Sequence, residues 1–182
     1  AVRLKRALIY YRTLYIQNAV DDLSYLLKKN PDDKTLLLNR ALALTDMRDY
    51  DAALRDVKRI LQDNDNDAAA IELNEELQML HDRDMKTILG YNKVLSETPD
   101  DPIVLYKRGM FFFDSCDTQT AVSDLTKFVS LSDDAVMLKD AYTILGDIFA
   151  MKNRYNDALV YYEKVYALQT ADAEIYKRIG YM

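Results

Sequence analysis

The 182-residue chain has few of the residues that break helices or crosslink a fold. It contains 4 glycines, 3 prolines and 1 cysteine, and it has no tryptophan. So little glycine and proline excludes a turn-rich β protein and favours helices joined by short polar loops. Cys116 has no second cysteine to pair with, and no Asn-x-Ser/Thr sequon occurs. Both features are typical of a reducing compartment, so we expect a cytoplasmic protein.

Long apolar runs and clusters of positive charge are also missing. The apolar runs are only a few residues long, far short of a membrane-spanning helix, and no basic-then-apolar leader opens the chain. The net charge is −6, and lysine and arginine are scattered along the sequence. We therefore expect neither membrane insertion nor a nucleic-acid partner.

What the chain does contain is a repeat of about 34 residues. Small residues recur at this spacing in two columns, and apolar residues follow those of the first column after one, four and seven positions. That spacing is typical of one face of an α-helix. Small residues in the second column would let two helix backbones approach closely. The first column is Ala19, Ala53, Thr87, Ala121 and Ala158, and the second is Ala7, Ala41, Gly109, Gly146 and Gly180.

This pattern resembles the tetratricopeptide repeat. The clearest match has Tyr142, Leu145, Gly146, Phe149, Tyr155, Ala158 and Tyr162 at the signature positions. The resemblance implies an all-α fold, a right-handed superhelical solenoid of antiparallel helix pairs, and a single array that is a fragment of a longer protein. The expected units are 1–33, 34–67, 68–101, 102–135 and 139–172, followed by the first helix of a sixth unit at 173–182.

Short polar residues mark the expected helix ends. Pro31 and Pro99 follow the second helices of their units, where a missing N–H stops a helix. Capping carboxylates are expected at the start of the next helices. Arginine replaces the usual leucine before several of the small residues. We expect its stem to lie on the neighbouring helix and its guanidinium to stay in water. The expected caps are Asp33, Asp67, Asp101 and Asp172, and the arginines are Arg6, Arg40 and Arg108.

The unit 68–101 departs most from the pattern. Strict register would bury Asn74, Glu75 and Gln78, and an unpaired buried carboxylate is costly. We therefore expect a first helix over 68–80 that rotates to bury Leu73 and Leu77. A longer turn at 81–84 would absorb the shift.

The resemblance also implies where a partner would bind, because in this family the first helix of each pair lines a concave groove. A helical wheel places apolar and polar side chains on that side, where a partner peptide or amphipathic helix would contact them. The alternative is that some of them simply pack on the adjacent helix. The candidate partner-binding residues are Leu38, Asn39, Leu42, Tyr106, Lys107, Met110, Phe113, Ile144 and Met151.

Other constellations predict no chemistry. The run 63–67 resembles the start of a calcium loop, but Ala68 and Asn74 stand where glycine and glutamate are required, so we interpret it as a capping loop. His81 and Cys116 are expected in turns, without partners for a metal site or a nucleophile. Only Asn39 matches the carboxylate clamp of co-chaperone repeats. We expect no catalytic residue, no cofactor and no metal.

The leading hypothesis is therefore a non-catalytic scaffold or adaptor for protein–protein interaction. One alternative is a self-associating structural assembly. Its contact would be the C-terminal helix, where Tyr176, Ile179 and Gly180 lack a covering second helix. Another alternative is a targeting arm of a larger multidomain protein such as a co-chaperone.

Overall fold

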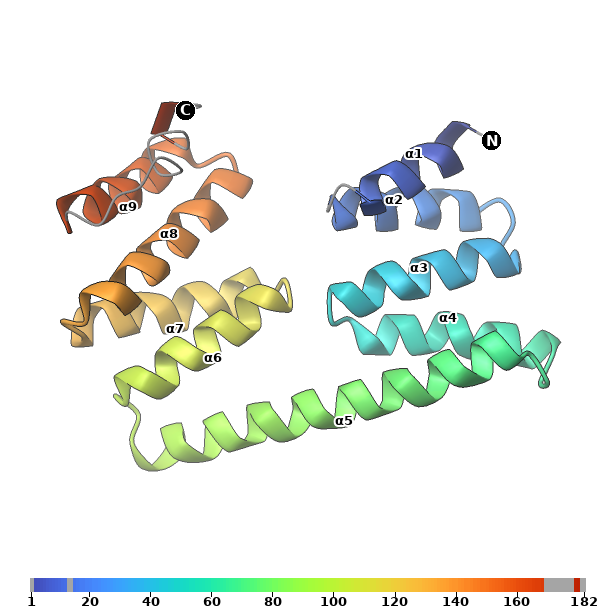
Figure 1. Ribbon diagram of the computed structural model, residues 1–182, viewed down its shortest axis with the longest axis horizontal. Helices are drawn as coiled ribbons and strands as arrows, with labels where there is room; N and C mark the ends of the chain where they lie inside the picture. The colour runs from blue at the N-terminus through green and yellow to red at the C-terminus, as the bar shows by residue number, and fades with distance from the viewer. Residues whose placement is uncertain (1, 13–14, 169–178, 181–182) are drawn as a thin grey trace. The chain divides into compact units, whose positions relative to one another are not determined.

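The computed structural model describes residues 2–12, 15–168 and 179–180, and in this part of the chain every regular element is an α-helix (Figure 1). The expected all-α class is confirmed. The helices are α1 (Val2–Arg12), α2 (Ile16–Leu27), α3 (Lys34–Asp46), α4 (Tyr50–Asp63), α5 (Ala68–Glu97), α6 (Pro102–Asp114), α7 (Thr118–Leu131), α8 (Ala135–Met151) and α9 (Tyr155–Ala167).

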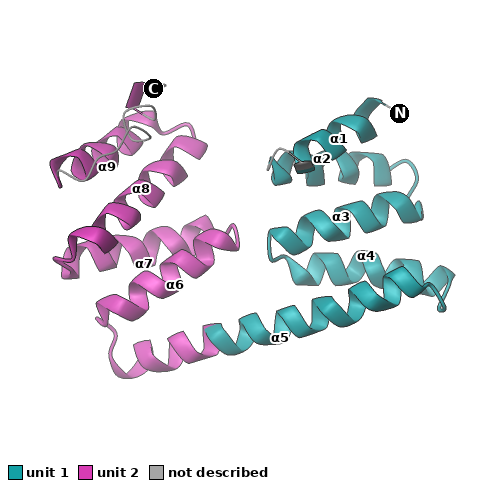
Figure 2. Ribbon diagram, in the orientation of Figure 1, with its two compact units in different colours: residues 1–87 teal, residues 88–182 magenta. Residues whose placement is uncertain are grey.

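The helices form two compact units, residues 1–87 and 88–182 (Figure 2). The first unit contains the pairs α1/α2 and α3/α4, and the second contains α6/α7 and α8/α9. Each unit also includes part of α5. In three pairs the turn contains a non-glycine residue with a left-handed backbone: Arg48 (φ 56°), Cys116 (φ 59°) and Asn153 (φ 58°).

Aspartates begin several of the helices, as expected. Asp33, Asp67 and Asp101 each accept a hydrogen bond from a backbone N–H of the first turn that follows, at 3.0–3.2 Å. Asp49 and Asp117 cap the second helices α4 and α7 in the same way. The corresponding prediction for Asp172 lies outside the described residues.

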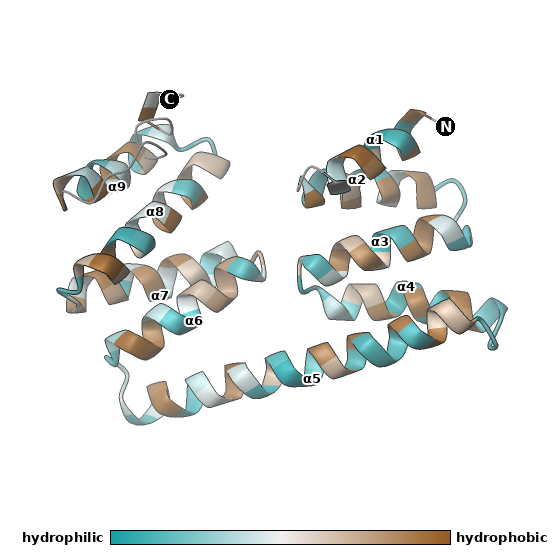
Figure 3. Cartoon of the chain, in the orientation of Figure 1, coloured by the Kyte–Doolittle hydropathy of each residue, from teal (hydrophilic) through white to brown (hydrophobic). Residues whose placement is uncertain are grey.

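Each unit has its own hydrophobic core, and apolar residues recur between polar ones along the helices (Figure 3). Four small residues of the second column, Ala7, Ala41, Gly109 and Gly146, are buried where helices approach, whereas Gly180 is exposed. A Cβ atom on Gly109 would come within 2.7 Å of Leu125 Cγ, and one on Gly146 would overlap the ring of Tyr162. The most deeply buried large side chains are Leu23, Leu37 and Val57 in the first unit, with Leu77 from α5, and Leu125, Phe128, Leu145, Ile148, Tyr162 and Val165 in the second.

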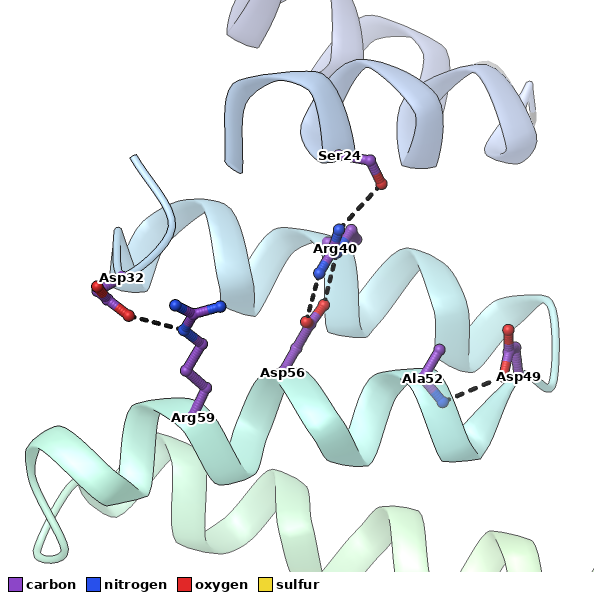
Figure 4. Close-up of polar contacts among 7 residues, drawn as sticks. All are labelled: Ser24, Asp32, Arg40, Asp49, Ala52, Asp56 and Arg59. Atoms are coloured by element: carbon purple, nitrogen blue, oxygen red, sulfur yellow. Dashed lines mark hydrogen bonds and ion pairs between the residues drawn. The ribbon is translucent and has the colours of Figure 1, made fainter. Parts of the chain in front are cut away.

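Arginine–aspartate pairs tie the two helices of a pair together. Arg40 of α3 donates from Nε and Nη2 to both oxygens of Asp56 on α4, at 2.7 and 2.6 Å, and from Nη1 to Ser24 Oγ of α2 at 3.0 Å (Figure 4). Arg108 binds Asp124 and Asn92 in the same way. The Arg40 and Arg108 side chains are mostly buried, so the expectation that these guanidinium groups stay in water is wrong.

The helix α5 joins what we expected to be two helices. The predicted rotation is confirmed, because Leu73 and Leu77 are buried whereas Glu75 is exposed. The predicted turn at 81–84 is wrong, since α5 is a single helix of 30 residues. His81 is accordingly helical, and its ring centroid lies 6.1 Å from that of Tyr50.

The third unit lacks the arginine–aspartate pair that α1/α2, α3/α4 and α6/α7 have. Asn74 and Gly90 stand 34 positions after Arg40 and Asp56, so the third unit lacks both partners of the ion pair. The small residue of the second column is also replaced, by Glu75. The side-chain oxygen of Asn74 is buried and has no hydrogen-bond partner among the residues described. The pair α8/α9 closes with Leu145 and Tyr161 at the two ion-pair positions, so the missing ion pair alone does not account for the continuous helix.

Candidate protein-binding site

The first helices of the pairs meet directly through tyrosine–aspartate hydrogen bonds. In the second unit, Tyr106 of α6 donates to Asp140 of α8 at 3.2 Å. In the first unit, Tyr11 of α1 is hydrogen-bonded to Asp46 of α3. Burial and this bond raise the pKa of Tyr11 to about 12. We call the surface formed by α1 and α3 the first-helix face of unit 1, and that formed by α6 and α8 the first-helix face of unit 2.

On the first-helix face of unit 1, the three predicted residues differ in exposure. Leu42 is 42% exposed. Leu38 is half-buried and packs partly against the core. Asn39 is also half-buried, and its side-chain amide donates to the backbone oxygen of Thr35 at 2.7 Å. This face thus offers an exposed leucine next to an amide and a second leucine.

The first-helix face of unit 2 carries aromatic and methionine side chains. Tyr106, Met110 and Phe113 of α6 are half-buried and pack partly against the core. The Tyr106 and Phe128 ring centroids are 5.1 Å apart. Burial and the nearby Asp140 raise the pKa of Tyr106. Lys107 is exposed and Met151 is 70% exposed. One part of each of the Tyr106, Met110 and Phe113 side chains therefore packs on adjacent helices, and the other part remains accessible to solvent.

Ile144 does not lie on this surface. It is 8% exposed and belongs to the core of the second unit, so a partner cannot reach it. The reason is the position of α8, which contacts α6, α7 and α9 and therefore buries a wide arc. That arc comprises Ala141, Ile144, Leu145 and Ile148.

Sequence reasoning missed the tyrosine–aspartate bonds that connect successive first helices. The available signal was the repeat itself, because Tyr106 and Asp140 are 34 residues apart. Residues 34 positions apart come together when two first helices lie side by side. A helical wheel drawn for one helix does not show this contact.

Other features that bear on function are metal-ligand clusters, membrane-spanning helices and the cysteine. No cluster of three or more His, Cys, Asp and Glu side chains that could hold a metal ion occurs there. None of the helices in that part is both long and apolar enough to cross a membrane. Cys116 is exposed as a residue. Partial desolvation of its thiol, together with the nearby Asp114, raises the pKa of the thiol, which lowers its reactivity.

No protein-family model matches the chain, and no curated protein matches it. The chain is similar to solved structures of tetratricopeptide-repeat proteins. One, from Parabacteroides merdae, is 21% identical over 98% of this chain and 69% of that chain, with a TM-score of 0.46. A thermophilic TPR protein of Thermus thermophilus is 16% identical over 98% of this chain and 95% of that chain, with a TM-score of 0.44.

A third structure is the APC/C hetero-tetramer Cut9–Hcn1. It is 17% identical over 97% of this chain and 35% of that chain, with a TM-score of 0.46. These similarities identify no partner, and the division into five units stays a prediction.

Proposed function

We propose that the chain is a non-catalytic scaffold for protein–protein interaction that binds a peptide or amphipathic helix on its first-helix faces. The observation that carries this proposal is the accessible apolar surface of Leu42 on unit 1 and Met151 on unit 2. Unit 2 adds the partly accessible side chains of Tyr106, Met110 and Phe113 on α6. Accessible apolar area on a folded protein is typical of an interaction surface.

The residue types suit a protein segment. Methionine adapts to irregular apolar surfaces, and an aromatic ring offers a large contact area. Lys107 is exposed beside them and would orient an acidic part of the partner, affecting the rate of association more than the affinity. The proposed contact residues are Leu38, Asn39, Leu42, Tyr106, Lys107, Met110, Phe113 and Met151.

The proposal needs no cofactor, and it involves neither a nucleic acid nor insertion into a membrane. We further propose the cytoplasm as the compartment. Its support is Cys116, an exposed thiol that a reducing environment would keep free.

Site-specific photo-crosslinking in the native cell tests the proposed surface. A photo-reactive amino acid replaces Lys107 on the first-helix face of unit 2, and the matched control replaces Val160, which is 50% exposed on the second helix α9. We expect a discrete protein adduct from position 107 and none from position 160. Adducts from position 160 alone would place the site on the second helices.

Substitution then tests the anchors without disturbing the core. Because Met151 is 70% exposed, Met151→Glu should leave the melting temperature unchanged. It should weaken binding of the crosslinked partner by about 1–3 kcal/mol, as expected for a central anchor. Val160→Glu is the control. Equal affinities of the two variants would contradict the proposal.

A further inference from the structure

One face of α5 carries large apolar side chains that are partly exposed to solvent. Met79 is 66% exposed, Leu89 61%, Met85 44% and Ile71 38%. On a helical wheel these four residues lie within an arc of about 120°, and Ile71 and Leu89 are about 27 Å apart along the axis. We call this arc, together with the exposed Glu75, Gln78, Asp82, Lys86 and Lys93, the open face of α5.

In the first unit, the open face lies opposite the side of α5 that packs against the core. Ala70, Leu73 and Leu77 are buried in that core. These residues fall on the other half of the helical wheel. The open face is therefore a surface that the described chain itself does not cover.

Charge is distributed unevenly along α5. Residues 68–82 contain four carboxylates and no cation. Residues 83–97 contain three cations and two carboxylates, and one of the two, Asp84, is buried. Two such helices side by side would repel if parallel, since their acidic halves would adjoin. In the antiparallel orientation each acidic half adjoins a basic half, which is favourable.

From this self-complementary pattern we infer that a second copy of the chain binds the open face, with the two α5 helices packed antiparallel about a two-fold axis. A two-fold axis brings the same patch of both molecules together, and here both copies contribute the open face of α5. The occupant is a second copy because one helix carries both an acidic and a basic half, each with exposed apolar residues.

Centring the axis at Asp82 gives a definite register. Met79 of one copy then lies opposite Met85 of the other, and Glu75 lies between Lys86 and Lys93 of the other copy. The two Asp82 side chains meet near the axis and repel each other. A single helix pair buries less area than stable dimers do, so we expect a weak dimer with a dissociation constant of roughly 1–100 µM.

Sedimentation equilibrium over a concentration series tests the dimer. We expect the average mass to rise from monomer toward dimer by about 300 µM, in line with that weak affinity. Leu89→Glu should keep the protein monomeric at every concentration, with an unchanged helical circular dichroism melt. Val160→Glu, at an apolar position on α9 that is 50% exposed, is the control and should still dimerise. A wild-type chain that remains monomeric throughout, or a dimer that Leu89→Glu leaves intact, overturns the inference.

Charge exchange tests the antiparallel register. Glu75→Lys alone and Lys86→Glu/Lys93→Glu alone should each dimerise more weakly than the wild type, while an equimolar mixture should form a heterodimer. Glu76→Lys makes the same charge change about 100° away on the wheel and is the control. Asp82→Asn should tighten the dimer because it removes the repulsion at the axis. A mixture that does not restore dimerisation rules out this arrangement.

Discussion

The hydroxyl of Tyr50, at the start of α4, donates a hydrogen bond of 2.9 Å to Asp84, which lies 34 residues later on α5. Arg48, in the preceding turn, donates to the same carboxylate at 3.2 Å, and Arg83 donates to its other oxygen at 3.1 Å. Asp84 is buried. Asp84 lies in the segment 81–84, where the repeat pattern predicted a turn. The bonds from Tyr50 and Arg48 fix this segment of α5 to the α3–α4 turn and keep the helix continuous.

Asp84→Ala should therefore destabilise the first unit. The substitution leaves the buried Tyr50 hydroxyl without its acceptor and removes one carboxylate partner of Arg48, at a cost of about 2–4 kcal/mol. Urea denaturation followed by circular dichroism measures it. Asp82→Ala, two residues earlier on the exposed side, is the control and should change the free energy of unfolding by less than about 0.5 kcal/mol. Equal effects would show that the bonds to Asp84 contribute nothing.

The ion pair of Arg40 and Asp56 should matter more than the surface pair of Arg59 and Asp32. Asp56→Ala leaves a largely buried guanidinium unpaired, so we expect a loss of about 2–4 kcal/mol. Both partners of the Arg59–Asp32 bond are well exposed, and Asp32→Ala should cost at most about 1 kcal/mol. Chemical denaturation of both variants makes the comparison. The double change Arg40→Met/Asp56→Leu should cost less than Asp56→Ala, and a larger cost would contradict this account.

Two helical glycines should respond to alanine in opposite directions. A Cβ on Gly146 would overlap the ring of Tyr162, which is buried and hydrogen-bonded to Asp147 at 2.7 Å. Gly146→Ala should therefore destabilise the second unit by about 1–3 kcal/mol. Nothing lies within 4 Å of a Cβ on Gly90, so Gly90→Ala should stabilise α5 by about 0.5–1 kcal/mol through higher helix propensity. Thermal melts of the two variants suffice, and shifts of the same sign would be the contrary result.

High pH should weaken the contact between α1 and α3. The pKa of Tyr11 is raised to about 12 in the folded protein, above the value of roughly 10 for an exposed tyrosine. The folded state thus holds this proton more tightly than the unfolded state. The resulting stabilisation is complete below about pH 10 and is lost as the pH rises toward 12.

NMR of ¹³C-labelled tyrosine, with Tyr11→Phe to assign the resonance, follows this titration. Asp46→Asn removes the nearby charge but keeps an acceptor, so the pKa of Tyr11 should fall and yet stay above its usual value because burial remains. An unchanged pKa in Asp46→Asn would mean that this carboxylate has no part in the shift.

The sequence was sufficient where one helix determines the outcome. Caps such as Asp33 and Asp101 follow from the chemistry of a single helix end. The rotation of the first half of α5 follows as well, because the competing registers differ in whether Glu75 becomes buried. In both cases the alternatives differ in free energy through residues of one helix, so they can be compared from the sequence alone.

It was insufficient where the outcome depends on residues from several elements. The continuous helix at 81–84 depends on bonds from Tyr50 and Arg48 to Asp84, which no helical wheel represents. The burial of Ile144 depends on three neighbouring helices around α8. One useful signal was present and unused, namely the spacing of 16 residues between Arg40 and Asp56. It recurs between Arg108 and Asp124, and between Arg6 and Asp22.

The third unit has neither the arginine nor the aspartate of the ion pair, and this limits how the sequences of such chains can diverge. An arginine that lost its aspartate, or an aspartate that lost its arginine, would leave an uncompensated charge between two helices. Loss of one partner alone is therefore selected against, whereas Asn74 and Gly90 together leave no charge behind. We expect relatives of this chain to carry the two positions as one inherited character, both ionic or both neutral. A unit in which both are neutral is free to exchange its turn for a longer helix.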